Sequence, residues 1–115
     1  MLNQLQALHA YRGAGRFRSQ REQEADVFRQ VNSALLAARE GTAIRQVRAL
    51  ADNRRLWTMV ADLMRDPSNQ LPASLRAQIL SLALRVQQEM DQEAPDFSFL
   101  ISINEDIAAG LAGNT

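Results

Sequence analysis

The sequence has no cysteine, no lysine and a single histidine among its 115 residues. Without cysteine, disulfide bonds and thiolate zinc sites are excluded. The histidine, His9, stands near the N-terminus without a recognisable nucleophile and orienting group, so we interpret it as a surface residue. Carboxylate pairs four residues apart occur, but without a histidine ligand nearby they are typical of solvated helix faces. We therefore predict neither an enzyme nor a bound cofactor or metal.

Long apolar runs are also missing. No stretch approaches the roughly 18 apolar residues that a membrane-spanning helix needs. The N-terminus lacks the cationic region and continuous apolar stretch of a secretory signal. We therefore expect a soluble, unexported protein that does not bind membranes.

The charges balance overall but are unevenly distributed. Thirteen arginines face thirteen acidic residues, so the net charge is zero and no overall field attracts nucleic acid. Four arginines between residues 12 and 21 precede the first acid, whereas only acids follow Arg85. The arginines, with Tyr11 and Phe17 among them, resemble a basic arm with aromatic stacking groups. The zero net charge and the acidic end nevertheless disfavour nucleic-acid binding.

Apolar residues recur at steps of three and four, and no segment alternates with period two, which predicts helices without strands. Helices are predicted over residues 19–38, 43–64, 72–90 and 96–111. Ser19 (in a capping box), Thr42 and Asp96 are predicted N-caps, because their side chains can accept bonds from free backbone N–H groups. Gly41 is expected to adopt the left-handed conformation that ends a helix. Pro72 suits the first turn of the third helix.

These helices predict an all-α fold, a small antiparallel bundle of about four main helices in one domain over residues 1–115. Leu2, Leu5 and Leu8 predict a short additional helix over residues 2–11, which is marginal unless it docks. Residues 1–18 are therefore expected to form an arm that is either packed or mobile. The helix over residues 72–90 has the broadest apolar face, which predicts burial on two sides and a central place.

The stretch over residues 53–86 contains the only tryptophan and the most regular apolar spacing. It is predicted to form a helical hairpin, whose first arm is one helix over residues 43–64 rather than two helices separated near Asp52. Trp57, Arg54 and Arg55 are residue types enriched at binding hot spots. A lone aromatic on an apolar stripe also packs inward, and for Trp57 the core is the favoured interpretation.

Three blocks of sequence carry a family resemblance. Residues 53–57 read NRRLW, residues 71–82 read LPASLRAQILSL and residues 100–111 read LISINEDIAAGL. In order, spacing and total length the chain resembles FlaF, a family of alphaproteobacterial flagellin-synthesis regulators, from about residue 21 to residue 111. Two positions depart from the family pattern. Arg85 stands where an aromatic is expected, and acids at 105 and 106 stand where a basic residue commonly follows the asparagine.

The resemblance implies a cytoplasmic, non-enzymatic factor that acts on flagellin as an export chaperone or regulator. Flagellin's terminal segments are amphipathic helices when assembled and aggregation-prone when free. An apolar groove on a helical protein would shield such a segment by helix-in-groove docking. We expect this groove beside the Trp57 helix and the helix over residues 72–90. The predicted partner contacts are Arg54, Arg55, Leu56, Trp57, Gln78, Leu82, Asn104 and Ile107.

Several alternatives stay open at this point. The amides of Gln78 and Asn104 either meet a partner or bond within the bundle, since a buried amide needs hydrogen bonds. The protein could instead regulate flagellin mRNA, directly through its arginine-rich arm or through a companion protein that controls flagellin translation. A third alternative is self-association through the broad apolar face of residues 72–90, so the oligomeric state is left open.

Overall fold

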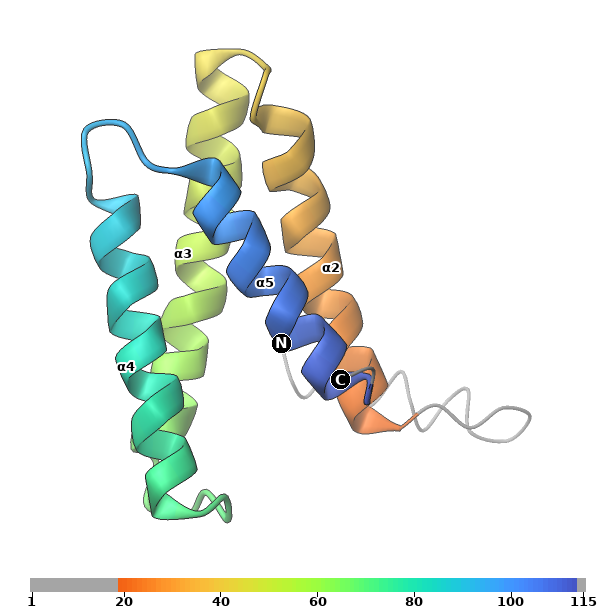
Figure 1. Cartoon of the computed structure of the whole chain (residues 1–115), viewed down its shortest axis with the longest axis vertical. Coiled ribbons are helices and arrows are strands. Elements are labelled where there is room, and N and C mark those ends of the chain that lie inside the picture. The colour runs from red at the N-terminus through yellow and green to blue at the C-terminus, as the bar shows by residue number, and fades with distance from the viewer. Residues whose placement is uncertain (1–18, 114–115) are drawn as a thin grey trace.

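The computed structural model describes residues 19–113, and within this range the chain is all-α (Figure 1). Its helices are α2 (Gln20–Ala38), α3 (Ala43–Arg65), α4 (Ala73–Met90) and α5 (Phe97–Leu111). The predicted all-α class and the predicted main helices are confirmed. The helix predicted over residues 2–11, and the arm over 1–18, lie outside the described residues. No helix within residues 19–113 is long and apolar enough to cross a membrane.

Consecutive helices run in opposite directions. Helix α3 packs against both α2 and α4, while α5 packs mainly against α2 (Figure 1). The α3–α4 hairpin and the α2–α5 pair stand close at one end of the molecule. They diverge toward the end that carries the α3–α4 turn (Figure 1).

Three helices begin at the side-chain caps predicted from the sequence. Ser19, Thr42 and Asp96 each accept a hydrogen bond from the backbone N–H three residues ahead, at 3.1, 3.3 and 3.1 Å. Such a cap satisfies one of the free N–H groups of the first turn and is typically worth about 1 kcal/mol. These boundaries were predictable because a cap and the backbone N–H that donates to it are neighbours in sequence.

The prediction for Gly41 is wrong. Among the described residues Gly113, just beyond α5, is the glycine with a positive φ, at 80°. Gly41 is instead constrained by space, because an added Cβ would lie 3.3 Å from the Ala37 carbonyl oxygen. Its N–H donates to the Ala38 carbonyl oxygen at 2.9 Å, which tightens the turn between α2 and α3.

Helix α3 is one continuous helix, as favoured from the sequence, and it ends before Pro67. At the turn, Asp66 Oδ1 accepts bonds from the Ser68 N–H at 2.9 Å and the Ser68 hydroxyl at 2.8 Å. Both bonds favour the carboxylate and lower the pKa of Asp66. Pro72 directly precedes α4, one residue earlier than predicted, and its carbonyl oxygen accepts from the Arg76 N–H at 3.0 Å.

The core lies where all four helices contribute side chains. Its largest fully buried apolar side chains are Trp57, Leu35, Leu56, Leu100 and Val86. Fully burying an aliphatic side chain of this kind stabilises a fold by about 1.5–3 kcal/mol. The core therefore lies mainly between α2, α3 and α5, and α4 joins it through its second half.

The predicted central place of the helix over residues 72–90 is wrong. Helix α4 packs mainly against α3, and its buried residues are Ala83, Val86 and Met90. Its other apolar side chains, including Leu75 and Leu84, stay exposed or partly exposed. The central elements are α2 and α3, because each of them packs against two other helices. The breadth of an apolar stripe does not fix how much of that stripe the fold covers.

Candidate functional site

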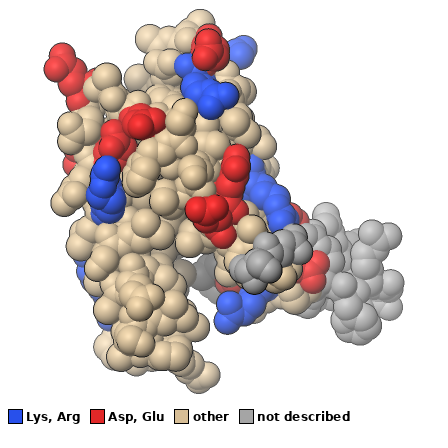
Figure 2. Space-filling model, in the orientation of Figure 1, with Lys and Arg blue, Asp and Glu red and all other residues tan. Residues whose placement is uncertain are grey.

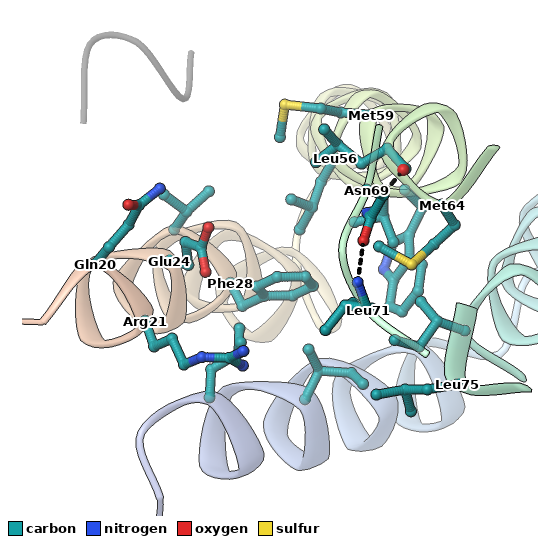
Figure 3. Close-up of a pocket in the computed structure, with 17 residues that line it drawn as sticks. Gln20, Arg21, Glu24, Phe28, Leu56, Met59, Met64, Asn69, Leu71 and Leu75 are labelled. Carbon is teal, nitrogen blue, oxygen red and sulfur yellow. Dashed lines mark hydrogen bonds between the residues drawn. The ribbon is translucent and has the colours of Figure 1, made fainter. Parts of the chain in front are cut away.

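An open apolar groove of about 540 Å³ lies where the two helix pairs diverge (Figure 3). One wall comes from the second half of α3, the α3–α4 turn and the first half of α4, and includes Met64, Leu71 and Leu75. The opposite wall comes from the start of α2 and the end of α5, which contributes Ile107 and Leu111. The groove thus combines segments from all four described helices.

The α3–α4 turn is held in shape by one asparagine. Asn69 Nδ2 donates to the Leu63 carbonyl oxygen at 2.9 Å, and the Leu71 N–H donates to Asn69 Oδ1 at the same distance (Figure 3). These two bonds join the end of α3 to the residue before Pro72. They fix the backbone of Leu71, whose side chain lines the groove.

The floor of the groove is aromatic. Phe28 and Trp57 both line it, and their rings meet edge to face with centroids 5.8 Å apart. Edge-to-face geometry places the positive edge of one ring against the negative face of the other, which adds about 0.5–1.5 kcal/mol beyond burial. Trp57 itself is fully buried, so it supports the groove from the core beneath it.

A buried hydrogen-bonded network lies behind this floor. Trp57 Nε1 donates to Asn104 Oδ1 at 2.9 Å, and Asn104 Nδ2 donates to Asn53 Oδ1 at 2.8 Å. Asn53 Nδ2 in turn lies 3.3 Å from the sulfur of Met90. The network connects α3, α4 and α5 and has no exposed member. Because buried polar groups are costly without partners, it fixes the relative positions of these helices.

The rim is polar where α2 begins. Gln20, Arg21 and Glu24 line this edge (Figure 3). Partial burial raises the pKa of the Glu24 carboxyl, and the nearby charge of Arg21 lowers it to a smaller extent. Desolvation therefore dominates at this carboxyl, as expected for an acid beside an apolar surface.

Three of the eight predicted partner contacts line the groove: Leu56, Trp57 and Ile107. Leu56 is only 2% exposed and Trp57 is fully buried, so both belong to the core beneath the groove. Asn104 does not line the groove. Its amide bonds within the bundle, which is the second of the two alternatives for this residue.

The other four predicted contacts do not line the groove. Arg54 pairs with Asp91 at 2.9 Å, joining α3 to the residue after α4. Arg55 is largely exposed and pairs with Asp52 at 3.8 Å. Gln78 is exposed, and Leu82 packs against the core from α4.

Sequence reasoning missed most of the groove lining, including Met64, Leu71, Leu75 and Ile79. Leu71, Leu75 and Ile79 lie within the block that carries the family resemblance, and Leu75 and Ile79 lie within the helix for which a broad apolar face was predicted, over residues 72–90. Their spacing indicated a buried face. A stripe broader than one helix contact requires was the available indication that part of it serves another purpose.

Arg85, which departs from the family pattern, contacts an aromatic ring. Its guanidinium carbon lies 4.6 Å from the centroid of Phe99 on α5, in cation–π geometry. The same guanidinium pairs with Glu89 at 3.3 Å. Arg85 thus links α4 to α5 at the surface, away from the groove.

Charged side chains of both signs are interspersed on the face shown in Figure 2. Within residues 19–113, no cluster of three or more histidine, cysteine or acidic side chains is arranged to hold a metal ion. The candidate site of this part of the chain is therefore the apolar groove.

Fold and site together define a small all-α bundle with an open apolar groove at one end. A family comparison then places it: the chain belongs to the flagellar protein FlaF family, whose profile matches residues 7–111. This is a flagellar regulatory family with no known catalytic activity, and the resemblance predicted from the sequence is confirmed. No significant match was found among curated proteins or among solved structures.

Proposed function

We propose that this protein binds a terminal helical segment of flagellin in its apolar groove and shields that segment before export. The observation that carries the proposal is the groove itself, open to solvent and lined largely by apolar side chains. Its volume of about 540 Å³ lies within the range of ligand-binding clefts. Membership of a flagellar protein family supports a role in flagellum biogenesis and makes flagellin the natural candidate ligand.

The chemistry of the lining suits one face of an amphipathic helix. Such a helix presents apolar side chains at steps of three and four, which would enter between the hairpin wall and the α2–α5 wall. Met59 and Met64 supply flexible thioether contacts that adapt to different side chains. Arg21 and Glu24 at the rim would meet the polar edge of the bound helix.

The direct test is a pull-down with this protein as bait. Full-length flagellin and flagellin lacking either terminal segment are offered at micromolar concentration. We expect capture that disappears when one terminus is deleted. No capture by a bait whose helical circular dichroism spectrum is intact would reject the proposal.

A matched pair of variants locates the site. Leu75 and Leu84 are both exposed leucines on α4, at 39% and 47%, but only Leu75 lines the groove. Leu75→Asp places a charge against apolar surface, so flagellin affinity should fall at least about tenfold, equivalent to roughly 1.4 kcal/mol. Leu84→Asp should leave affinity within about twofold. Equal losses in both variants would place the binding site elsewhere.

Regulation of flagellin mRNA remains the second candidate function. Direct RNA contact was predicted for the four arginines between residues 12 and 21. Of these, only Arg21 falls among the described residues, and it lies at the groove rim. Filter binding of flagellin mRNA by the same purified protein separates the two functions. Salt-dependent RNA binding without flagellin capture would favour the mRNA candidate.

A further inference from the structure

The groove presents apolar side chains that no described residue covers. Leu71, Leu75 and Ile79 on the hairpin wall, and Ile107 and Leu111 on α5, all line it and all keep accessible surface. Contiguous exposed apolar surface is unfavourable in water and marks an interaction site. In the absence of a partner, the protein would therefore gain stability from any apolar segment able to reach this surface.

The polypeptide enters the described structure at the edge of the groove. Ser19 caps α2, and Gln20, Arg21 and Glu24 in the first turns of α2 line the groove (Figure 3). The 18 residues that precede Ser19 therefore join the described structure at the groove rim.

The first eleven of these residues have the chemistry of an apolar ligand. They read MLNQLQALHAY and contain no acidic residue, arginine or lysine, so they bring no side-chain carboxylate, guanidinium or ammonium into an apolar site. Leu2, Leu5 and Leu8 recur at steps of three, which aligns them on one face of a helix. A helix over residues 2–11 would be about 15 Å long. A helix this short is unstable alone in water and needs a surface to dock on.

The connection to α2 is long enough and permissive enough for such docking. Residues 12–19 span up to about 26 Å when extended. Gly13 and Gly15 within them allow the chain to reverse direction. We propose that residues 2–11 dock into the groove as a short helix, so that the protein's own N-terminal segment occupies the site until a partner helix displaces it. This proposal rests on the groove and on the chain path, and it goes beyond flagellin binding.

Because the chain has no cysteine, cross-linking tests this occupant directly. Full-length protein carrying Leu5→Cys and Leu75→Cys is treated with a short bismaleimide in the absence of flagellin. The control carries Leu5→Cys and Leu84→Cys, whose second site lies on the same helix but outside the groove. We expect the groove pair to form an intramolecular cross-link at least ten times faster than the control pair.

Each other outcome overturns the proposal. Equal rates for the two pairs would mean that the segment does not prefer the groove. A cross-linked dimer whose yield rises with protein concentration would mean that a second copy supplies the occupant. Since no flagellin is present, failure here leaves the proposed function standing, and failure of the pull-down leaves this result standing.

A second variant avoids cysteine altogether. Leu5→Ser combined with Leu8→Ser should release the segment from the groove. The fluorescence of an apolar probe such as anilinonaphthalene sulfonate should then increase at least threefold. If the pull-down captures flagellin, the double variant should bind it more tightly than the original protein does. The matched control, Gln4→Ser with Gln6→Ser, should change neither measurement. Probe fluorescence that is the same in both double variants would contradict the proposal.

Discussion

The two halves of α4 have the same kind of apolar spacing but different surroundings. In the second half Ala83, Val86 and Met90 are buried against α3, and the sulfur of Met90 meets the Asn53 amide. In the first half no residue is buried, and Leu75 and Ile79 line the groove. The same helix thus closes the bundle at one end and, at the other, presents apolar surface that no described residue covers.

This difference separates the half of the helix that stabilises the bundle from the half that lines the proposed binding site. The buried half is anchored by packing and by the polar network, so the other half is held in position without being covered by another of the described helices. A rigidly held apolar surface is a better binding site than a mobile one, because less ordering is needed on association. Substitutions in the two halves should therefore have different consequences.

The largest effect is expected at the centre of the packed region. Trp57→Ala removes a fully buried side chain, its contact with Phe28 and its bond to Asn104. The free energy of unfolding should fall by about 3–5 kcal/mol, as for other aromatic-to-alanine changes in cores. Because the variant lacks the tryptophan, urea unfolding is followed by circular dichroism, which reports the loss of helix. A loss below 1 kcal/mol would mean that the core does not depend on this ring.

Asn104→Ala should have the next largest effect. It leaves Trp57 Nε1 and Asn53 Oδ1 buried without their partner, at a cost of about 1–3 kcal/mol for an unsatisfied group. We expect a total loss of about 2–3 kcal/mol in urea unfolding. The double variant with Asn53→Ala should lose less than the sum of the single changes, because the two amides share one network. Simple additivity would show that the network is not coupled.

The comparison within α4 is sharpened by one pair of alanine substitutions. Val86→Ala removes two methyl groups from a fully buried site and should cost about 1.5 kcal/mol. Leu75→Ala removes more atoms but from a side chain that is 39% exposed, so it should cost less than about 1 kcal/mol. Flagellin affinity should show the reverse order. Equal unfolding losses would remove the distinction between the two halves.

The helix boundaries were predictable because their determinants are local. Ser19, Thr42 and Asp96 each bond within three residues of themselves, and Pro67 acts on the residue before it. The prediction of a left-handed conformation for Gly41 was wrong, because this glycine is required by its close approach to the preceding turn and not by a positive φ. Sequence pattern indicates that a glycine is needed but not which of the two reasons applies.

The site was predictable only in part, because core and groove call for the same residue types. Trp57 and Asn104 are among the predicted contacts, and they bond to each other across 47 positions of sequence, in agreement with the favoured core interpretation of Trp57 and the within-bundle alternative for Asn104. Leu75 has the spacing of a core residue and lines the groove instead. Whether an apolar residue joins the core or lines the groove depends on where the α3–α4 hairpin diverges from the α2–α5 pair. That divergence is set by packing between segments that are distant in sequence.

The smallest predicted effect lies at the groove rim and depends on pH. Burial raises the pKa of Glu24 above its usual value of 4.5, against a smaller opposing influence of Arg21. The folded protein therefore binds this proton more tightly than the unfolded chain does, and stability falls as pH rises from 4.5 through the raised pKa.

Glu24→Gln removes this dependence, so the variant should gain stability relative to the original protein as pH rises through that interval, and keep the gain at neutral pH. Urea midpoints measured between pH 4 and pH 7 test the sign. A gain that appears only on acidification would mean that Arg21 holds the carboxylate more strongly than the apolar groove disfavours it.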